Sequence, residues 1–291
     1  MPMSRMQYSS GNRRTVNPRR RVLNCLFLAV CCLILLSAAA IIFLKVHYSS
    51  GGIVYDGYLG HTATDAVIDE EYEDFAIRPG TVAIIPNSES DSGMFRSAAS
   101  IELPDGLITI GARVFKQTAG LKSIVIPNSV TTIGAQAFEN CADLQSVTLS
   151  AGLTEIPDSC FSWCSSLNGI DIPGSVNRIG SKAFSRCAGL KSLTIPDSVT
   201  QIAEGAFTEC TGLTQVTLSN RLTAIKPMTF NKCVRLKNIV VPDSVTVIRA
   251  DAFKLCASLE TASVPETTKI EQDAFPPYTK IIKRPAAQAA Q

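Results

Sequence analysis

The chain has 291 residues, of which 46% are hydrophobic and 18% are charged, a composition that favours a folded protein over a disordered one. Its formal net charge of +2 is unevenly distributed. Residues 1–45 contain seven Lys or Arg and no acid. Residues 46–291 contain the other 20 Lys or Arg and all 25 Asp or Glu, so their net charge is −5. The body of the protein therefore lacks the clustered basic surface of a nucleic-acid-binding protein, and no nucleic-acid partner is expected.

An apolar segment follows the basic N-terminus. Residues 22–44 contain no charged side chain, and as a helix they would be about 34 Å long, enough to cross a hydrocarbon core of roughly 30 Å. Six arginines precede this segment: Arg5, Arg13, Arg14, Arg19, Arg20 and Arg21. Positive charge tends to remain on the cytoplasmic side of a membrane. We therefore predict a basic cytoplasmic tail at 1–21, a single transmembrane signal-anchor helix at 22–44, and an extracellular or luminal location for the rest.

Two other interpretations of this segment stay open. Ala38, Ala39 and Ala40 form a small-residue pattern at which a secretory signal peptide can be cleaved, although the apolar run continues to Leu44. The segment is also rich in arginine and free of acids, as mitochondrial presequences are. In the first alternative the anchored protein becomes a secreted one.

The next part of the chain is acidic. Nine Asp or Glu and only two arginines lie between residues 46 and 97. Gly and Ser are frequent there and apolar residues are few, which favours a solvated spacer. We predict an acidic stem at 45–74 and a degenerate N-terminal cap at 75–97, where PGTVAII resembles the repeated PNSVTTI.

A repeat of 23 residues then occupies most of the chain. One phenylalanine recurs at 115, 138, 161, 184, 207, 230 and 253, and again at 275; a leucine keeps the same step from 121 to 259, and a cysteine from 141 to 256. A fixed period of this length is the signature of a stacked solenoid. We predict eight 23-residue repeats at 98–280, followed by a C-terminal tail at 281–291.

Each repeat contains three expected elements. LKSLTIP (190–196) alternates apolar and polar residues like a half-buried strand, and Pro196 ends it by removing a backbone donor. DSVTQI gives a turn and a second short extended piece, in which Val199 and Ile202 point inward. AEGAFTEC predicts a short helical turn that buries Ala206, Phe207 and Cys210. A single repeat cannot enclose these side chains, so its interior has to be completed by neighbouring repeats.

The pattern L-x-x-I-x-I-P-x-S-V-x-x-I-G-x-x-A-F-x-x-C resembles the Treponema-type, or BspA-like, class of leucine-rich repeats. Ser150 and Ser219, where proline is usual, and Pro157, where glycine is usual, are mild departures. The resemblance implies a curved right-handed solenoid with a parallel sheet on its concave face. It also implies a bacterial or protist surface protein that serves adhesion to host or matrix proteins, with no shared catalytic residues.

No catalytic site, metal site or cofactor is expected. Both histidines, His47 and His61, precede the repeats, so a Ser-His-Asp or Cys-His site inside the solenoid is excluded. No glycine-rich phosphate loop and no paired CxxC motif is present. The repeated cysteines are interpreted as free, buried thiols, because side chains in register run parallel and bridge poorly. Cys160 lies outside that register, and both a disulfide with Cys164 and an exposed thiol remain open for it.

Recognition of a protein is the expected function, because the solenoid presents one long, weakly charged surface that suits a flat partner better than a small molecule. Trp163 occupies a turn position that is polar in most repeats, so it is either an exposed interface anchor or a cover over its own repeat. The candidate binding residues are Trp163, Asn168, Asp171, Lys191, Thr194 and Thr217. We expect cell-surface adhesion; the alternative is a scaffold protein of a lumen or organelle membrane without an external ligand.

Overall fold

The structure is a computed structural model, and it describes residues 98–285 continuously. It also describes residues 45–46, 55–56, 74–76, 83–84 and 95–96. The predicted transmembrane segment, residues 22–44, lies outside this part of the chain. Inside it, no helix is both long enough and apolar enough to span a membrane.

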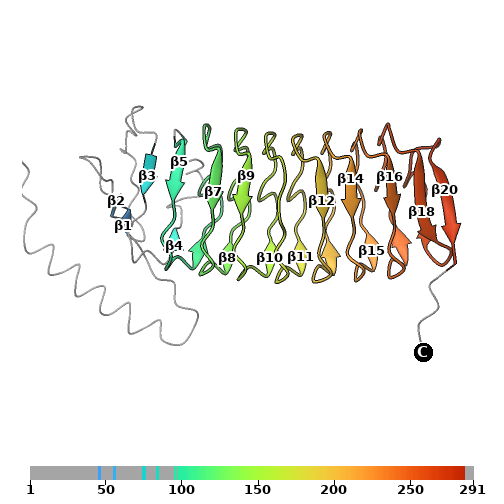
Figure 1. The fold of residues 1–291 in the computed structure, drawn as a ribbon, viewed down its shortest axis with the longest axis horizontal. Helices are drawn as coiled ribbons and strands as arrows, with labels where there is room; N and C mark the ends of the chain where they lie inside the picture. The colour runs from blue at the N-terminus through green and yellow to red at the C-terminus, as the bar shows by residue number, and fades with distance from the viewer. Residues whose placement is uncertain are drawn as a thin grey trace, which may run out of the picture. The chain divides into compact units, whose positions relative to one another are not determined.

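Short parallel strands form two rows along the stack of coils (Figure 1). The first strand row consists of β3 (Asp74–Ala76), β5 (Ser100–Glu102), β7 (Ser123–Val125), β9 (Ser146–Thr148), β12 (Ser192–Thr194), β14 (Gln215–Thr217), β16 (Asn238–Val240), β18 (Thr261–Pro265) and β20 (Lys280–Arg284). The second strand row consists of β4 (Ala83–Ile84), β6 (Thr109–Ile110), β8 (Thr132–Ile133), β10 (Glu155–Ile156), β11 (Arg178–Ile179), β13 (Gln201–Ile202), β15 (Ala224–Ile225), β17 (Val247–Ile248) and β19 (Lys269–Ile270). A separate antiparallel pair joins β1 (Lys45–Val46) to β2 (Tyr55–Asp56).

The register of the strands follows the sequence period. Ser192 pairs with Gln215 and Arg178 with Gln201, in each case 23 residues apart. At the C-terminal end the spacing shortens, because Val247 pairs with Lys269 and Thr261 with Lys280. The paired strand β20 ends at Arg284, so the stack continues beyond residue 280, where the sequence placed the start of a tail. The predicted solenoid of parallel strands is confirmed; its curvature and hand stay predictions.

The core lies between the two strand rows and the turns, where the predicted residues are buried. Leu190, Leu193 and Ile195 are buried from the first row, and Val199 and Ile202 from the second. From the turns come seven fully buried phenylalanines at the 23-residue positions: Phe115, Phe138, Phe161, Phe184, Phe207, Phe230 and Phe253. Their rings stack on one another with centroids 5.1 to 5.5 Å apart. Phe95 extends this column at one end, 5.1 Å from Phe115, and Phe275 at the other, 4.8 Å from Phe253.

The predicted helical turns are wrong: the described residues contain strands and turns but no helix. In the AEGAFTEC segment, Gly205 and Glu209 have φ angles of 64° and 59°, in the left-handed region that ends an α-helix. The N–H groups of Gly205, Phe207 and Glu209 donate to carbonyls of the next coil, at 3.1, 2.9 and 2.7 Å. Alternate amides therefore bind the neighbouring coil instead of their own turn, which adds a third line of hydrogen bonds between coils.

Ser150 and Ser219 stand where the repeat usually has proline, and each hydroxyl makes two hydrogen bonds there. The Ser219 hydroxyl is buried and donates to the Val199 carbonyl at 2.7 Å, and it accepts the Arg221 N–H at 3.1 Å. Ser150 makes the same pair of contacts, donating to the Val130 carbonyl at 2.6 Å and accepting from the Gly152 N–H at 3.0 Å. A hydroxyl with both roles satisfied can be buried at low cost, so these departures leave the coil intact.

Candidate functional site

The outward side chains of the first strand row form a shallow, weakly charged surface. Within each strand the middle side chain points into the core, so the residues on either side of it face solvent. One column of these outward residues runs the length of the stack: Glu102, Val125, Thr148, Asp171, Thr194, Thr217, Val240 and Ser263. All of them except the half-buried Ser263 are exposed. Four of these eight residues carry a hydroxyl group, two are valines and two are acids.

The strand ladder of this surface is interrupted. Residues 169–172, between β9 and β12, form no strand, and β9 and β12 belong to different sheets. The ladder is also interrupted between β5 and β7 and between β14 and β16, since each of these pairs belongs to different sheets. A hollow lies at the interruption by residues 169–172, and another at the interruption between β14 and β16.

The first hollow has a volume of about 250 Å³. It is lined by Gly169, Ile170, Asp171, Ile172, Ser192, Thr194 and Pro196. Two of the predicted binding residues, Asp171 and Thr194, therefore come together in one hollow. Asn168 and Lys191 directly precede lining residues in sequence and are exposed, but neither lines the hollow.

The second hollow has a volume of about 660 Å³ and includes the predicted residue Thr217. Arg284 of β20 reaches into it across two coils. Its guanidinium lies 2.7 Å from the Asp243 carboxylate and donates to the Val241 carbonyl. The sequence prediction missed Arg284, because it placed this residue in a tail beyond the last repeat. The C-terminal strand is thereby fastened to the coil two positions before it.

Trp163 lies in a turn, not on the first strand row, so it does not join the other predicted residues. Its side chain is 46% exposed, and the Arg186 guanidinium carbon lies 3.9 Å from the centre of its ring. Arg186 also pairs with Glu209 at 3.1 Å, and Glu209 with Lys232 at 3.1 Å. Trp163 thus begins a line of contacts along the turns, half covered by the next coil and half open to solvent.

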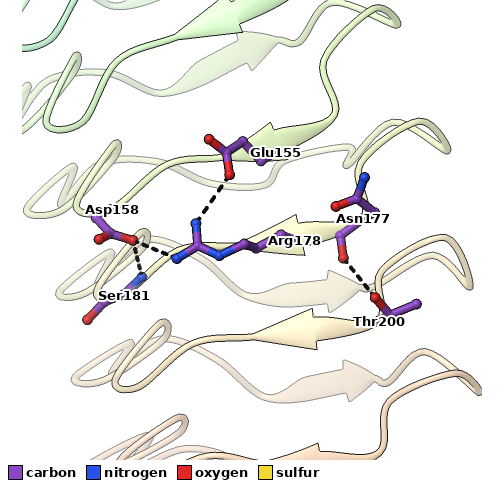
Figure 2. A network of polar contacts seen from close by, with 6 residues as sticks. All are labelled: Glu155, Asp158, Asn177, Arg178, Ser181 and Thr200. Atoms are coloured by element: carbon purple, nitrogen blue, oxygen red, sulfur yellow. Dashed lines mark hydrogen bonds and ion pairs between the residues drawn. The ribbon is translucent and has the colours of Figure 1, made fainter.

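On the surface of the second strand row, three neighbouring coils share a network of polar contacts (Figure 2). Arg178 lies between two acids, 3.2 Å from the Glu155 carboxylate and 3.4 Å from that of Asp158. Asp158 also accepts the Ser181 N–H at 2.8 Å. Because these contacts join neighbouring coils, we assign this network to the contacts between coils.

The seven cysteines of the described repeats are free and buried, which confirms the prediction for the six in register. Each of those six donates its S–H to a phenylalanine carbonyl of the preceding coil, over S···O distances from 2.9 to 3.3 Å. Cys160 is also free and buried, so it is neither an exposed thiol nor bonded to Cys164. Burial raises the pKa of the Cys210 thiol to about 12, and it raises the pKa of Cys160, Cys164, Cys187 and Cys233 as well. Protonated, enclosed thiols are poor nucleophiles.

In the described part of the chain, no three His, Cys, Asp or Glu residues are arranged to hold a metal ion. Both histidines lie outside that part.

Comparison with known proteins gives a family match and several similar structures. The match is to the BspA type leucine-rich repeat region (6 copies), over residues 92–202 and 154–282. No curated protein matches the chain. A leucine-rich repeat protein from Bacteroides ovatus is 21% identical with a TM-score of 0.55, over 85% of this chain and 67% of that one, which shows the fold alone.

Two other solved structures are similar at lower TM-scores. A leucine rich cell surface protein from Faecalibacterium prausnitzii is 28% identical with a TM-score of 0.48, over 76% of this chain. A leucine-rich repeat protein from T. pallidum is 26% identical with a TM-score of 0.43, over 68% of this chain and 78% of that one. The chain spans 61% of the length of the Faecalibacterium protein. Because the matched residues run from 92 to 282 and cover more than half of the sequence, this chain belongs to the BspA type leucine-rich repeat family.

Proposed function

We propose that this chain is a membrane-anchored protein that binds a protein partner through its first strand row, in adhesion at the cell surface. The observation that carries the proposal is the exposed column from Glu102 to Ser263. With coils about 4.8 Å apart, its eight positions extend over roughly 34 Å, a length suited to a protein surface. The apolar residues 22–44 and the arginines before them support the anchor.

The two strand rows allow a matched test of the binding surface. Thr148, Thr194 and Thr217 are exposed on the first row, and Thr154, Thr200 and Thr223 are exposed or half-buried near the second. We expect the triple variant Thr148→Lys, Thr194→Lys, Thr217→Lys to weaken partner binding at least tenfold, since bulk and charge at an interface centre prevent close contact. Binding of the full chain in detergent micelles to purified fibronectin, fibrinogen, laminin and collagen is measured by biolayer interferometry.

The control is the triple variant Thr154→Lys, Thr200→Lys, Thr223→Lys, which adds the same charge to the other surface. Its affinity should stay within about twofold of the original, because exposed substitutions away from an interface change little. Equal losses in the two triple variants would contradict binding by the first strand row. If none of the four matrix proteins binds the original chain, the proposed adhesion to matrix is wrong.

The alternative function is a scaffold in a lumen or at an organelle membrane. It rests on the same apolar segment and repeats, but places the repeats inside the cell instead of at its surface. Protease added to intact cells separates the two. The surface proposal expects the repeats to be accessible to antibody and protease while a tag on the N-terminus is protected. Repeats that stay shielded until the cells are permeabilised favour the scaffold.

A further inference from the structure

The first hollow, defined above by the interruption at residues 169–172, contains polar side chains with unused hydrogen-bonding capacity. The Asp171 carboxylate and the hydroxyls of Ser192 and Thr194 make no hydrogen bond or ion pair with any described residue. An ionised carboxylate accepts hydrogen bonds only, and hydroxyls accept as well as donate. The three groups line one hollow and together favour a ligand that donates several hydrogen bonds.

The hollow also has an apolar floor. Ile170 and Ile172 are each 8% exposed as whole residues, whereas their counterparts one coil further, Leu193 and Ile195, are each 2% exposed. The missing ladder between the two coils uncovers this apolar surface. Gly169 widens the opening, since a Cβ added there would meet no atom within 4 Å. The neighbouring coils carry Ser146 and Ser192 at the same position.

Size and charge narrow the class of occupant. A volume of about 250 Å³ lies below the usual range for small-molecule pockets, so it suits one side chain rather than a whole ligand. Asp171 gives the hollow a negative charge. The nearest cation in sequence, Lys191, directly precedes the lining residue Ser192, but it forms no ion pair with Asp171.

We propose that the first hollow receives one arginine side chain of the protein partner. The apolar stem of the arginine lies over Ile170 and Ile172, and its planar guanidinium donates to the Asp171 carboxylate and to the hydroxyls of Ser192 and Thr194. Arginine fits better than lysine, because its fork of five N–H donors matches a carboxylate with flanking hydroxyls. This inference rests on the proposed function, and it names the chemistry of the partner at one point of the surface.

The test uses N-acetyl-arginine amide as the probe and the full chain in detergent micelles, with ¹³C-labelled isoleucine δ1 methyl groups. We expect the methyl signals of Ile170 and Ile172 to shift on titration, with those of Ile239 and Ile248 unchanged. N-acetyl-citrulline amide, which has nearly the same shape without the charge, should give no shift. Equal shifts with the two probes, or shifts at all isoleucines alike, would overturn the proposal.

Three variants test which residues are involved. Asp171→Asn should weaken binding of the arginine probe about fivefold, because a partly exposed ion pair is lost. Gly169→Leu fills the opening, where the structure leaves room for a side chain, and should abolish the methyl shifts. Lys191→Gln should strengthen binding about twofold by removing a like charge next to the lining residue Ser192. A loss of affinity in Lys191→Gln, or none in Asp171→Asn, contradicts the assigned site.

Glu102→Gln is the matched control, because it removes an exposed acid from the same column three coils away. It should leave the affinity for the probe unchanged. Failure of this inference is distinguishable from failure of the proposed function. Suppose that only the first-row triple variant loses partner binding, while the arginine probe leaves the methyl signals of Ile170 and Ile172 unchanged. The assignment of the first hollow to an arginine is then wrong, and the proposed binding surface is still supported.

Discussion

Replacing Phe207 with alanine should lower the free energy of unfolding by about 3–5 kcal/mol and the melting temperature by roughly 10 °C. Phe207 is fully buried, and its ring stacks between Phe184 at 5.3 Å and Phe230 at 5.4 Å. The substitution leaves a cavity in a column of rings that two neighbouring coils share, and the turns around it are tied to both coils by hydrogen bonds. Thermal melting followed by far-UV circular dichroism measures the change.

Trp163→Ala is the control, since it removes an even larger aromatic ring from a turn at the surface. Its only described ring contact is the guanidinium of Arg186, worth about 0.5–1 kcal/mol at an exposed site. The melting temperature should therefore fall by no more than a few degrees. Similar losses in Phe207→Ala and Trp163→Ala would mean that the phenylalanine column does not hold the coils together.

Alkaline pH should destabilise the folded repeats steeply, beginning near pH 9. Five buried thiols, Cys160, Cys164, Cys187, Cys210 and Cys233, have a pKa raised by burial, to about 12 for Cys210. Above the ordinary thiol pKa the unfolded chain loses these protons while the folded chain keeps them. The unfolded state then binds fewer protons, so the free energy of unfolding falls as pH rises. Each thiol contributes about 1 kcal/mol per pH unit until its folded pKa is reached.

Urea unfolding at pH 8, 9 and 10 measures this effect, and Cys210→Ser provides the comparison. The serine hydroxyl can still donate to the Phe184 carbonyl, which the Cys210 thiol contacts at 3.1 Å, but it does not ionise in this range. The variant should therefore lose about 1 kcal/mol less per pH unit than the original chain. An identical dependence on pH in the two proteins would contradict a protonated, buried Cys210.

The sequence predicted the parts of the fold that recur in every coil. The inward positions of Leu193, Val199 and Phe207 follow from the 23-residue register, and the structure buries all three. The turn conformation did not follow, because the residues with positive φ have no common type. Trp163, Glu209 and Leu255 adopt it at equivalent positions, and none of them favours it by itself. The positive φ angles accompany hydrogen bonds to the next coil, and these bonds cannot be predicted from the sequence of one repeat.

The candidate site was predicted in part. Alternation along LKSLTIP (190–196) placed Thr194 on the outer surface, and the repeat period placed Asp171 at the same position one coil earlier, where the structure has both. The hollow between them could not be predicted, since it depends on an interrupted ladder in a coil whose sequence keeps the usual pattern. Arg284 was missed for a similar reason: its partner Asp243 is 41 residues away, outside the repeat period.

Each coil completes the interior of its neighbours, and fragments of different length test this dependence most directly. Residues 190–212 contain one coil, residues 167–212 two and residues 121–235 five. Thermal melting by circular dichroism should give no cooperative transition for the first two fragments and a cooperative one for the third. A two-coil fragment that melts cooperatively near the temperature of the full chain would contradict the shared core.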